Sequence, residues 1–296
     1  MPSCPSMVGG TVAHFAVSLE SDAVFLRRAY TFRVRGTPIR FPTSGYRGIM
    51  SAMSPLSTLQ NLAEATSEAV AHYWLTRQRQ RQRQEESGRA DQGARSAVTG
   101  GAQMDGFIRL FTRIIVEAGI DPRFIFSKKA LELPGFFRPT KKWDLLVVKD
   151  DQLLVALEAK SQVGPSFANN FNNRTEEAMG SALDIWTAYR EGAFNRGAQP
   201  FLGYFFMLEE CPASTAPVKV REPHFRVFTE FVASSYARRY ELFCRKLVRE
   251  RHYTAAAFIT SRGDTGLNGQ YREPAADLSV AILARALSAH MSASVS

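Results

Sequence analysis

The stretch of sequence that decides the fold is WDLLVVKDDQLLVALEAK, residues 143–160. It holds two runs typical of β-strands, residues 143–148 and 153–159, in which Leu and Val dominate. The polar residues KDDQ between the runs are typical of a turn, so the stretch predicts a β-hairpin. The charged residues near the ends of these apolar runs stand out, because an ionised group without a function is costly to place in an apolar strand.

Three of these charged residues are expected to converge. If the hairpin loop holds three residues, Lys149 pairs with Leu153, and counting outward places Asp144 opposite Glu158. Directly opposed residues of antiparallel strands have Cβ atoms about 4.5–5.5 Å apart, where like charges repel, and a bound cation would remove that repulsion. Lys160 follows Glu158 by two residues and therefore lies on the same face of its strand.

Two carboxylates and a lysine are the groups that metal-assisted hydrolysis of a phosphodiester needs. Mg²⁺ held by carboxylates can neutralise charge on the phosphate and stabilise the leaving oxygen, and a lysine beside it can orient or deprotonate the attacking water. Hard oxygen ligands favour Mg²⁺ or Mn²⁺ over zinc. The alternative is a strand that merely ends in a solvated Glu-x-Lys. The apolar surroundings of the acidic residues and the basic charge of the chain favour hydrolysis.

The composition is that of a basic globular protein. The chain has 296 residues and a formal net charge of +9, which suits a protein that binds polyanions such as nucleic acid. Hydrophobic residues make up 45% and can close a sizeable core, which excludes global disorder. No apolar run approaches the ~18–20 residues of a membrane-spanning helix, and the first Lys or Arg is Arg27, so we expect no secretory signal, no membrane and a cytoplasmic protein.

Expected helices and strands alternate over residues 56–296, which predicts one domain with an α/β core. Residues 1–55 lack sustained periodicity, so we expect an extension that is disordered or that precedes a true start near Met50. Ser57 is expected to cap the first helix, and Asn173 to open a later helix as part of a capping box. The other expected elements are a connector at 88–101, a helix ending at Gly119, strands at 200–208 and 255–259, and helices at 229–252 and 277–290.

The charged residues of the hairpin resemble the motif of the PD-(D/E)xK nuclease superfamily. Asp144 matches the Asp of the motif, and Glu158, Ala159 and Lys160 match its (D/E)xK element. The residue before Asp144 is Trp143 rather than Pro, which departs from the motif. The resemblance implies a restriction-endonuclease-like fold, a mixed β-sheet flanked by helices. It also implies the Ala159 backbone carbonyl as a further metal ligand beside the two carboxylates.

Longer strings resemble the XhoI family of type II restriction endonucleases, and the resemblance covers roughly residues 57–291. The strings are AVTGG (97–101), QMDGF (103–107), SQVGPS (161–166), NNFNNRTEEA (169–178), DIWTAYR (184–190), EPHF (222–225), SYARRY (235–240) and CRKLV (244–248). This resemblance implies a homodimeric, Mg²⁺-dependent bacterial enzyme that cuts both DNA strands within the palindrome CTCGAG and leaves 5′ overhangs. It also implies a separate DNA methyltransferase as a functional partner that protects host DNA.

Polar residues just beyond the catalytic strand are candidates for DNA contact, because Asn and Gln suit the edge of adenine and Arg suits guanine. The alternative is that these Asn residues serve turn geometry and helix capping. In the superfamily a third acidic residue from an early helix often joins the metal site, and Asp105 and Glu117 are both candidates. The candidate DNA-binding residues are Gln162, Asn169, Asn170, Asn172, Asn173 and Arg174.

Two further functions are left open by the sequence. One is a repair or structure-specific nuclease of the same superfamily, and the other is a DNA-binding protein without catalytic activity. The sequence has no GxxxxGK[ST] phosphate loop, so we expect no nucleotide cofactor, and it has no paired His and Cys ligands of a zinc nuclease. A two-fold symmetric DNA site is most simply read by a two-fold symmetric protein, which also favours a dimer.

Overall fold

The computed structural model describes residues 57–86, 101–195 and 197–295. The predicted N-terminal extension, and all of the predicted connector except Gly101, lie outside the described residues. Within the described ranges, no helix is long and apolar enough to span a membrane.

A five-stranded mixed sheet forms the centre of the protein, in the order β1-β4-β5-β6-β7. β1, β4 and β5 pair antiparallel, and β6 and β7 continue the sheet parallel to β5. A separate two-stranded sheet joins β2 to β3. The strand bounds are β1 Ile125–Phe126, β2 Glu132–Pro134, β3 Thr140–Lys142, β4 Leu145–Lys149, β5 Gln152–Gln162, β6 Phe201–Glu209 and β7 Ala255–Ser261.

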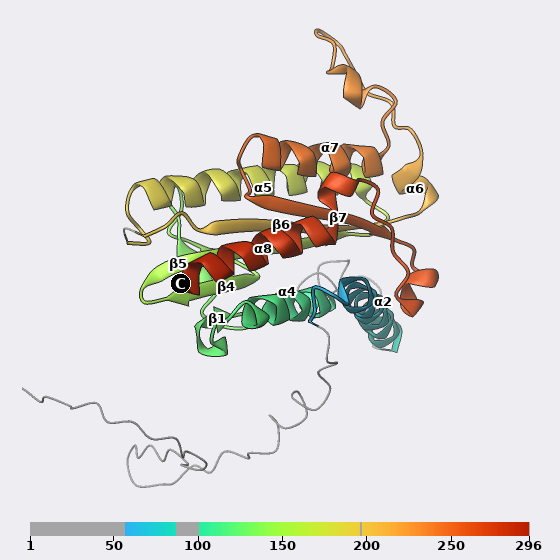
Figure 1. Cartoon of the computed structure of the whole chain (residues 1–296). Coiled ribbons are helices and arrows are strands. Elements are labelled where there is room, and N and C mark those ends of the chain that lie inside the picture. Colours follow the sequence, from blue (N-terminus) through green and yellow to red (C-terminus); the bar gives the residue numbers. More distant parts are fainter. Residues whose placement is uncertain (1–56, 87–100, 196, 296) are drawn as a thin grey trace, which may run out of the picture. The chain divides into compact units, whose positions relative to one another are not determined.

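Helices cover both faces of this sheet (Figure 1). Helices α2, α4 and α8 pack on one face of the sheet and form a hydrophobic core with it that includes Tyr73 and Leu283. Helices α5 and α7 pack on the other face and form a second core that includes Trp143 and Tyr240. Because both faces are covered, the central strands are apolar along most of their length. The predicted fold class, a mixed sheet flanked by helices, is confirmed. The helix bounds are α2 Leu62–Glu86, α4 Asp105–Glu117, α5 Phe167–Arg190, α6 Pro212–Thr215, α7 Tyr236–Arg249 and α8 Val280–Val295.

The predicted hairpin forms, but its loop is shorter than expected. Lys149 pairs with Gln152, so the loop holds two residues rather than three, and the predicted pairing of Lys149 with Leu153 is wrong. Asp150 and Asp151 both have positive φ, 51° and 58°. This conformation matches the two-residue turns that suit the right-handed twist of hairpin strands.

A β-bulge corrects the register before the strands reach the charged residues. The register shifts by one residue within the pair, so Leu154 has no direct partner in β4. Leu145 therefore pairs with Leu157, and Asp144 comes next to that pair, with its backbone N–H donating to the Leu157 carbonyl at 3.3 Å. Counting one further residue along each strand places Asp144 opposite Glu158, as predicted. The pairing arises from a two-residue loop and a bulge rather than from a three-residue loop.

The predicted start of α5 at Asn173 is wrong, because α5 already begins at Phe167. The ring of Phe167 stacks on Tyr236 with centroids 5.9 Å apart, and Phe171 meets Tyr240 edge to face at 5.0 Å. These contacts with α7 stabilise the first turns of α5 and override the weak helix propensity of the Asn residues among them. Asn173 therefore lies inside the helix.

Other helix ends also differ from their predicted positions. α7 begins only at Tyr236, where the Ser235 hydroxyl accepts from the Arg238 N–H at 3.2 Å, and the stretch before it contains a short 3₁₀ turn. Ser57 does not cap the first helix, which begins at Leu62 after an irregular turn. The last helix begins at Val280 and ends at Val295. In each case the hydrophobic periodicity located the helix but not its end.

Asp184 of α5 fastens the loop between β2 and β3. Its carboxylate accepts the backbone N–H groups of Phe136 and Phe137 at 2.7 and 2.9 Å, and Arg138 Nε at 2.7 Å. A Cβ atom on Gly135 would lie 2.5 Å from this carboxylate, so only glycine fits there. Burial raises the pKa of Asp184, but these hydrogen bonds and the Arg138 charge lower it more, and the resulting pKa lies below the usual value.

We expect Asp184→Ala to lower the free energy of unfolding by about 3 kcal/mol at neutral pH, because it removes a buried carboxylate that accepts two backbone N–H groups and the Arg138 guanidinium. Since the folded-state pKa is depressed, this contribution is present above the unfolded pKa of about 3.9 and is lost as the pH falls through the folded-state value. Urea unfolding at pH 7 and at progressively lower pH checks both statements. Glu176→Ala, at an exposed position of the same helix, is the control. An equal effect of the two variants at pH 7 would contradict the assigned role.

Candidate active site

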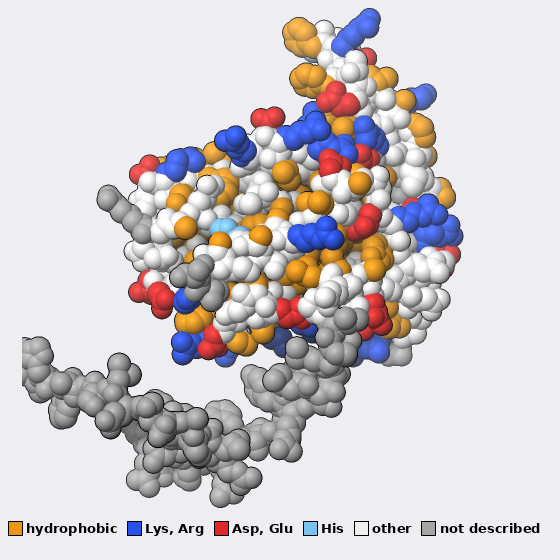
Figure 2. Space-filling view, viewed as in Figure 1, with side chains coloured by type: hydrophobic (Ala, Val, Ile, Leu, Met, Phe, Trp, Pro, Cys, Tyr) orange, Lys and Arg blue, Asp and Glu red, His pale blue; other side chains and the backbone are white. Residues whose placement is uncertain are grey.

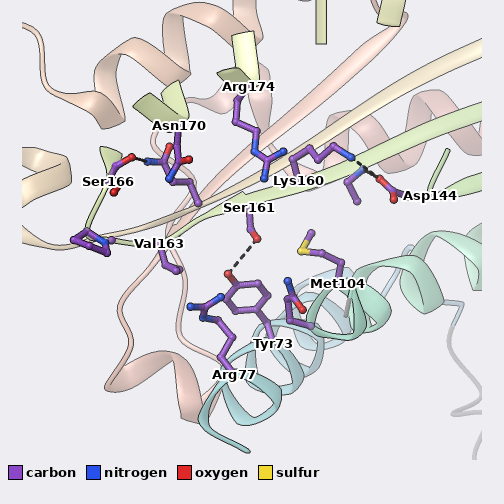
Figure 3. A pocket seen from close by; sticks show the side chains of 16 residues that line it. Tyr73, Arg77, Met104, Asp144, Lys160, Ser161, Val163, Ser166, Asn170 and Arg174 are labelled. Carbon is purple, nitrogen blue, oxygen red and sulfur yellow. Dashed lines mark hydrogen bonds and ion pairs between the residues drawn. The ribbon is translucent and has the colours of Figure 1, made fainter. Parts of the chain in front are cut away.

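A cavity of about 370 Å³ lies beside the free part of β5. β4 pairs with β5 only as far as Leu157, so from Glu158 onward this side of β5 has no partner strand in the described part of the chain. Asp144, Ala159 and Lys160 line the cavity at this edge, and residues of α2 and α5 line it elsewhere. Figure 3 shows the Lys160 and Asp144 side chains meeting at one end of the cavity.

Asp144 lines the cavity next to the free edge of β5, and its side chain is partly exposed to solvent. Its Oδ2 accepts the Ala159 backbone N–H at 2.9 Å and lies 3.4 Å from Lys160 Nζ. About a third of the side chain, 35%, is exposed. The other carboxylate oxygen has no hydrogen bond to a described residue, so Asp144 can still coordinate a ligand in the cavity.

Glu158 is fully buried and has three partners. Oε1 lies 2.9 Å from Lys141 Nζ and 3.1 Å from Lys160 Nζ, and Oε2 accepts the Tyr253 hydroxyl at 3.0 Å. Burial alone would raise the pKa of Glu158, but the charges of Lys160 and Lys141 lower it more, so its pKa lies below the usual value. The carboxylate is therefore ionised and surrounded by cations.

Lys160 connects the two predicted carboxylates. Burial lowers its pKa, but the charges of Glu158, Asp144 and Glu177 raise it more, and the resulting pKa lies above the usual value. In the free protein Lys160 is thus a cation that donates hydrogen bonds. Glu177 lies 3.7 Å from Lys160 Nζ and 2.7 Å from Arg174, so the network continues into α5.

Sequence reasoning missed three members of this network, Lys141, Glu177 and Tyr253. Lys141 Nζ lies over the ring of Trp143 at 4.1 Å, besides its ion pair with Glu158. The departure from the motif, Trp143 in place of Pro, was a signal that could have pointed to Lys141, since aromatic rings attract lysine. Tyr253 lies 95 residues after Glu158 in sequence, and no local pattern marks it.

The structure brings together only part of the predicted DNA-binding set. Asn170 and Arg174 line the cavity from α5. Gln162 also borders the cavity, but it is buried, its Oε1 accepts the Tyr240 hydroxyl, and its Nε2 donates to the Ser166 carbonyl at 3.4 Å. The remaining three do not line the cavity but lie exposed on α5: Asn169, Asn172 and Asn173.

Neither candidate for the third acidic residue lines the cavity. Glu117 lies at the opposite end of α4 from the cavity wall and accepts the backbone N–H of Thr58 at 2.8 Å. Asp105 is exposed at the first turn of α4. The two residues just before it, Gln103 and Met104, do line the cavity, so this part of the chain contributes an amide where an acid was expected.

The donor set of the cavity fits a hard divalent cation. Asp144 offers a free carboxylate oxygen, and the buried amide oxygen of Gln103 has no hydrogen-bond partner among the described residues. The carbonyl of Ala159 belongs to the unpaired edge of β5. Oxygen ligands of these types suit Mg²⁺. Over the described ranges, however, no three or more His, Cys, Asp or Glu side chains are close enough together to hold a metal ion between them. Glu158 can join a cation only if a lysine moves away from it.

A mixed sheet with an Asp, a Glu and a Lys converging at the free edge of its central hairpin defines the PD-(D/E)xK class of nucleases. Comparison with known families gives the narrower assignment. The family model for restriction endonuclease XhoI matches residues 83–273, and the chain belongs to this family. It is therefore a type II site-specific deoxyribonuclease, of a class that acts on double-stranded DNA and generally uses divalent metal ions.

Individual relatives agree with this assignment. The type II restriction enzyme BstVI of Geobacillus stearothermophilus is 55% identical over 195 residues, 64% of this chain and 87% of the relative. AbrI of Azospirillum brasilense is 52% identical over 54% of this chain and 72% of its own length. XhoI of Xanthomonas vasicola is 45% identical over 60% of this chain and 72% of its own length. No solved structure matches the chain.

Proposed function

We propose that this enzyme cuts both strands of duplex DNA within the palindrome CTCGAG, in a Mg²⁺-dependent reaction that leaves 5′ overhangs. The observation that carries the chemistry is the convergence of Asp144, Glu158 and Lys160, of which Asp144 and Lys160 line the cavity and Glu158 is buried directly behind them. The recognition sequence and the overhang come from the resemblance to the XhoI family, which the 45% identity to XhoI itself supports.

In this proposal each residue has a separate task. Asp144, the Ala159 carbonyl and, after a shift of its lysines, Glu158 would hold the cation. The cation would supply charge neutralisation at the phosphate and a lower pKa for water. Lys160, as a cation, would donate a hydrogen bond to the scissile phosphate or orient the attacking water. Arg174, held by Glu177 at 2.7 Å, would bind the DNA backbone from the α5 side.

The proposal includes a homodimer, because a palindrome presents the same contacts twice, related by a two-fold axis. It also includes a separate DNA methyltransferase as a functional partner, since an enzyme that cuts a short sequence would otherwise cut the DNA of its own cell. A bacterial cytoplasm is the location that this task requires, and the relatives named above come from bacteria.

Digestion of a sequenced plasmid tests the proposal directly. With Mg²⁺ we expect discrete linear fragments whose ends map to CTCGAG and carry 5′ overhangs, and no cleavage with EDTA. Fragments that end at another sequence would contradict the recognition site but not the enzyme class. Nicking confined to flaps or junctions would instead indicate a structure-specific nuclease, and binding without cutting would indicate a non-catalytic protein. Sedimentation of the protein with a palindromic duplex tests the dimer.

A further inference from the structure

Unpaired polar atoms are found on the side of the cavity that α2 and the short 3₁₀ helix Ala102–Met104 form. In the described part of the chain, four buried side-chain atoms have no hydrogen-bond partner: Arg77 Nε, Gln80 Oε1, Gln103 Oε1 and Tyr204 Oη. Two of these residues, Arg77 and Gln103, line the cavity. Because buried polar groups are nearly always hydrogen-bonded in folded proteins, two such atoms on one wall indicate that a polar ligand completes it.

Arg77 is held next to the cavity by the residue one turn before it. The Tyr73 hydroxyl donates to Ser161 Oγ on β5 at 3.1 Å, which fixes α2 against the free edge of the strand. Burial raises the pKa of Tyr73, whereas the charge of the neighbouring Arg77 and a hydrogen bond from its guanidinium to the Tyr73 hydroxyl lower it. Figure 3 shows Arg77 entering from α2, on the side of the cavity opposite Arg174.

The charge of Arg77 is not neutralised within the described ranges, where no carboxylate forms an ion pair with it. The other two cations of the cavity are both paired. Lys160 lies within 4 Å of three carboxylates, and Arg174 lies 2.7 Å from Glu177. Many surface cations are paired as well: Figure 2 shows Lys and Arg next to acidic side chains over α7, where Arg245 bonds Asp277 at 2.6 Å. Arg77 is thus a cation that lacks an anion.

We propose that Arg77 donates hydrogen bonds to a phosphate of the DNA strand that is cut, so that α2 forms the wall of the DNA groove opposite α5. This inference rests on the proposed nuclease function and adds a phosphate contact to it. The guanidinium is planar, always charged and forked, which suits phosphate oxygens. A phosphate at Arg77 and the catalytic residues at the other end of the same cavity would fix the strand at two points.

The helix that carries Arg77 also provides matched controls. The sequence alternates Arg and Gln over residues 77–83, which on a helix spreads the arginines over different sides. The structure separates them: Arg77 lines the cavity, whereas Arg79, Arg81 and Arg83 are exposed. Arg79→Ala therefore removes the same charge from the same helix without touching the cavity.

The test measures binding of a cognate duplex in Ca²⁺ by fluorescence anisotropy over a range of salt concentrations. We expect Arg77→Ala to weaken binding about 10-fold to 100-fold, as for the loss of a charge-assisted hydrogen bond, and to reduce the salt slope by about 1. Arg77→Lys should restore part of the affinity and the slope. Arg77→Met keeps the packing of the stem and should match the alanine variant. Thermal unfolding should change little, because the guanidinium forms no ion pair with a described residue and its one neighbour of note, the Tyr73 hydroxyl, keeps its hydrogen bond to Ser161.

Two results would overturn the inference. One is equal affinity and equal salt slope for the variants Arg77→Ala, Arg77→Met and Arg79→Ala. The other is a loss of binding that follows a loss of thermal stability in both Arg77→Ala and Arg77→Met, which would make the residue structural. If the inference fails, the wild-type protein and Arg79→Ala still cut DNA at discrete sites. If instead the proposed function fails, the wild-type protein itself does not cut, so the two failures are distinguishable.

Discussion

Lys160→Ala is expected to slow DNA cleavage by about 10² to 10³-fold or more while cognate binding in Ca²⁺ stays largely intact. Lys160 Nζ lies 3.4 Å from Asp144 and 3.1 Å from Glu158, at the edge of the cavity where the phosphate is proposed to lie. A donor that stabilises charge developing in the transition state contributes on this scale. Because the interaction strengthens during the reaction, its loss lowers kcat more than it raises KM.

Single-turnover cleavage of a labelled duplex in Mg²⁺ measures this effect. Lys149→Ala is the matched control, since Lys149 lies at the other end of the same hairpin, next to the turn. Asp144→Asn should behave like Lys160→Ala, because an amide replaces a carboxylate of nearly the same shape. Full activity of Lys160→Ala would refute its catalytic role, whereas equal loss in Lys149→Ala would show that the hairpin and not the site is affected.

The hairpin shows how far sequence reasoning reaches in this protein. Opposed Asp144 and Glu158 followed from counting along two apolar strands, but the count assumed a three-residue loop. The real loop holds two residues, and the bulge at Leu154 adds one residue back to β5. Nothing local in LLVVKDDQLLVAL marks the bulge, because its position depends on the packing of both faces of the sheet. The prediction of Asp144 opposite Glu158 was thus correct because the shorter loop and the bulge each shift the register by one residue, in opposite directions.

The rest of the site was less accessible from sequence because its contacts are long-range. The Asn residues suggested turn geometry and a helix that opens at Asn173, but the rings of Phe167 and Phe171 pack on α7 and stabilise a helix that begins at Phe167. Tyr253 hydrogen-bonds Glu158 across 95 residues of chain. Residue type and spacing pointed to the strand that we propose to be catalytic, whereas the partners that neutralise its charges come from elements that only the fold brings together.

Glu158→Ala is expected to lower the free energy of unfolding by about 3–5 kcal/mol, besides abolishing cleavage. Glu158 is fully buried between two lysines, and Lys141 is only 10% exposed. Removing one partner of a buried ion pair leaves an uncompensated charge, which costs this much. Lys160 keeps Asp144 and Glu177, but among the described residues Lys141 keeps only the Trp143 ring and the carbonyl of Lys142. Lys141 should therefore account for most of the loss.

A double-mutant cycle separates this structural effect from catalysis. Urea unfolding without metal should show that Lys141→Met added to Glu158→Ala recovers much of the lost stability, because the second change removes the stranded charge. Cleavage should stay absent in the double variant, since the carboxylate is still missing. If the double variant is no more stable than Glu158→Ala, Lys141 is not the group that depends on Glu158. Loss of activity in Glu158→Ala alone is ambiguous, because unfolding also removes activity. A folded and inactive double variant, beside an active Lys141→Met single variant, would therefore be the stronger evidence that Glu158 acts in the reaction itself.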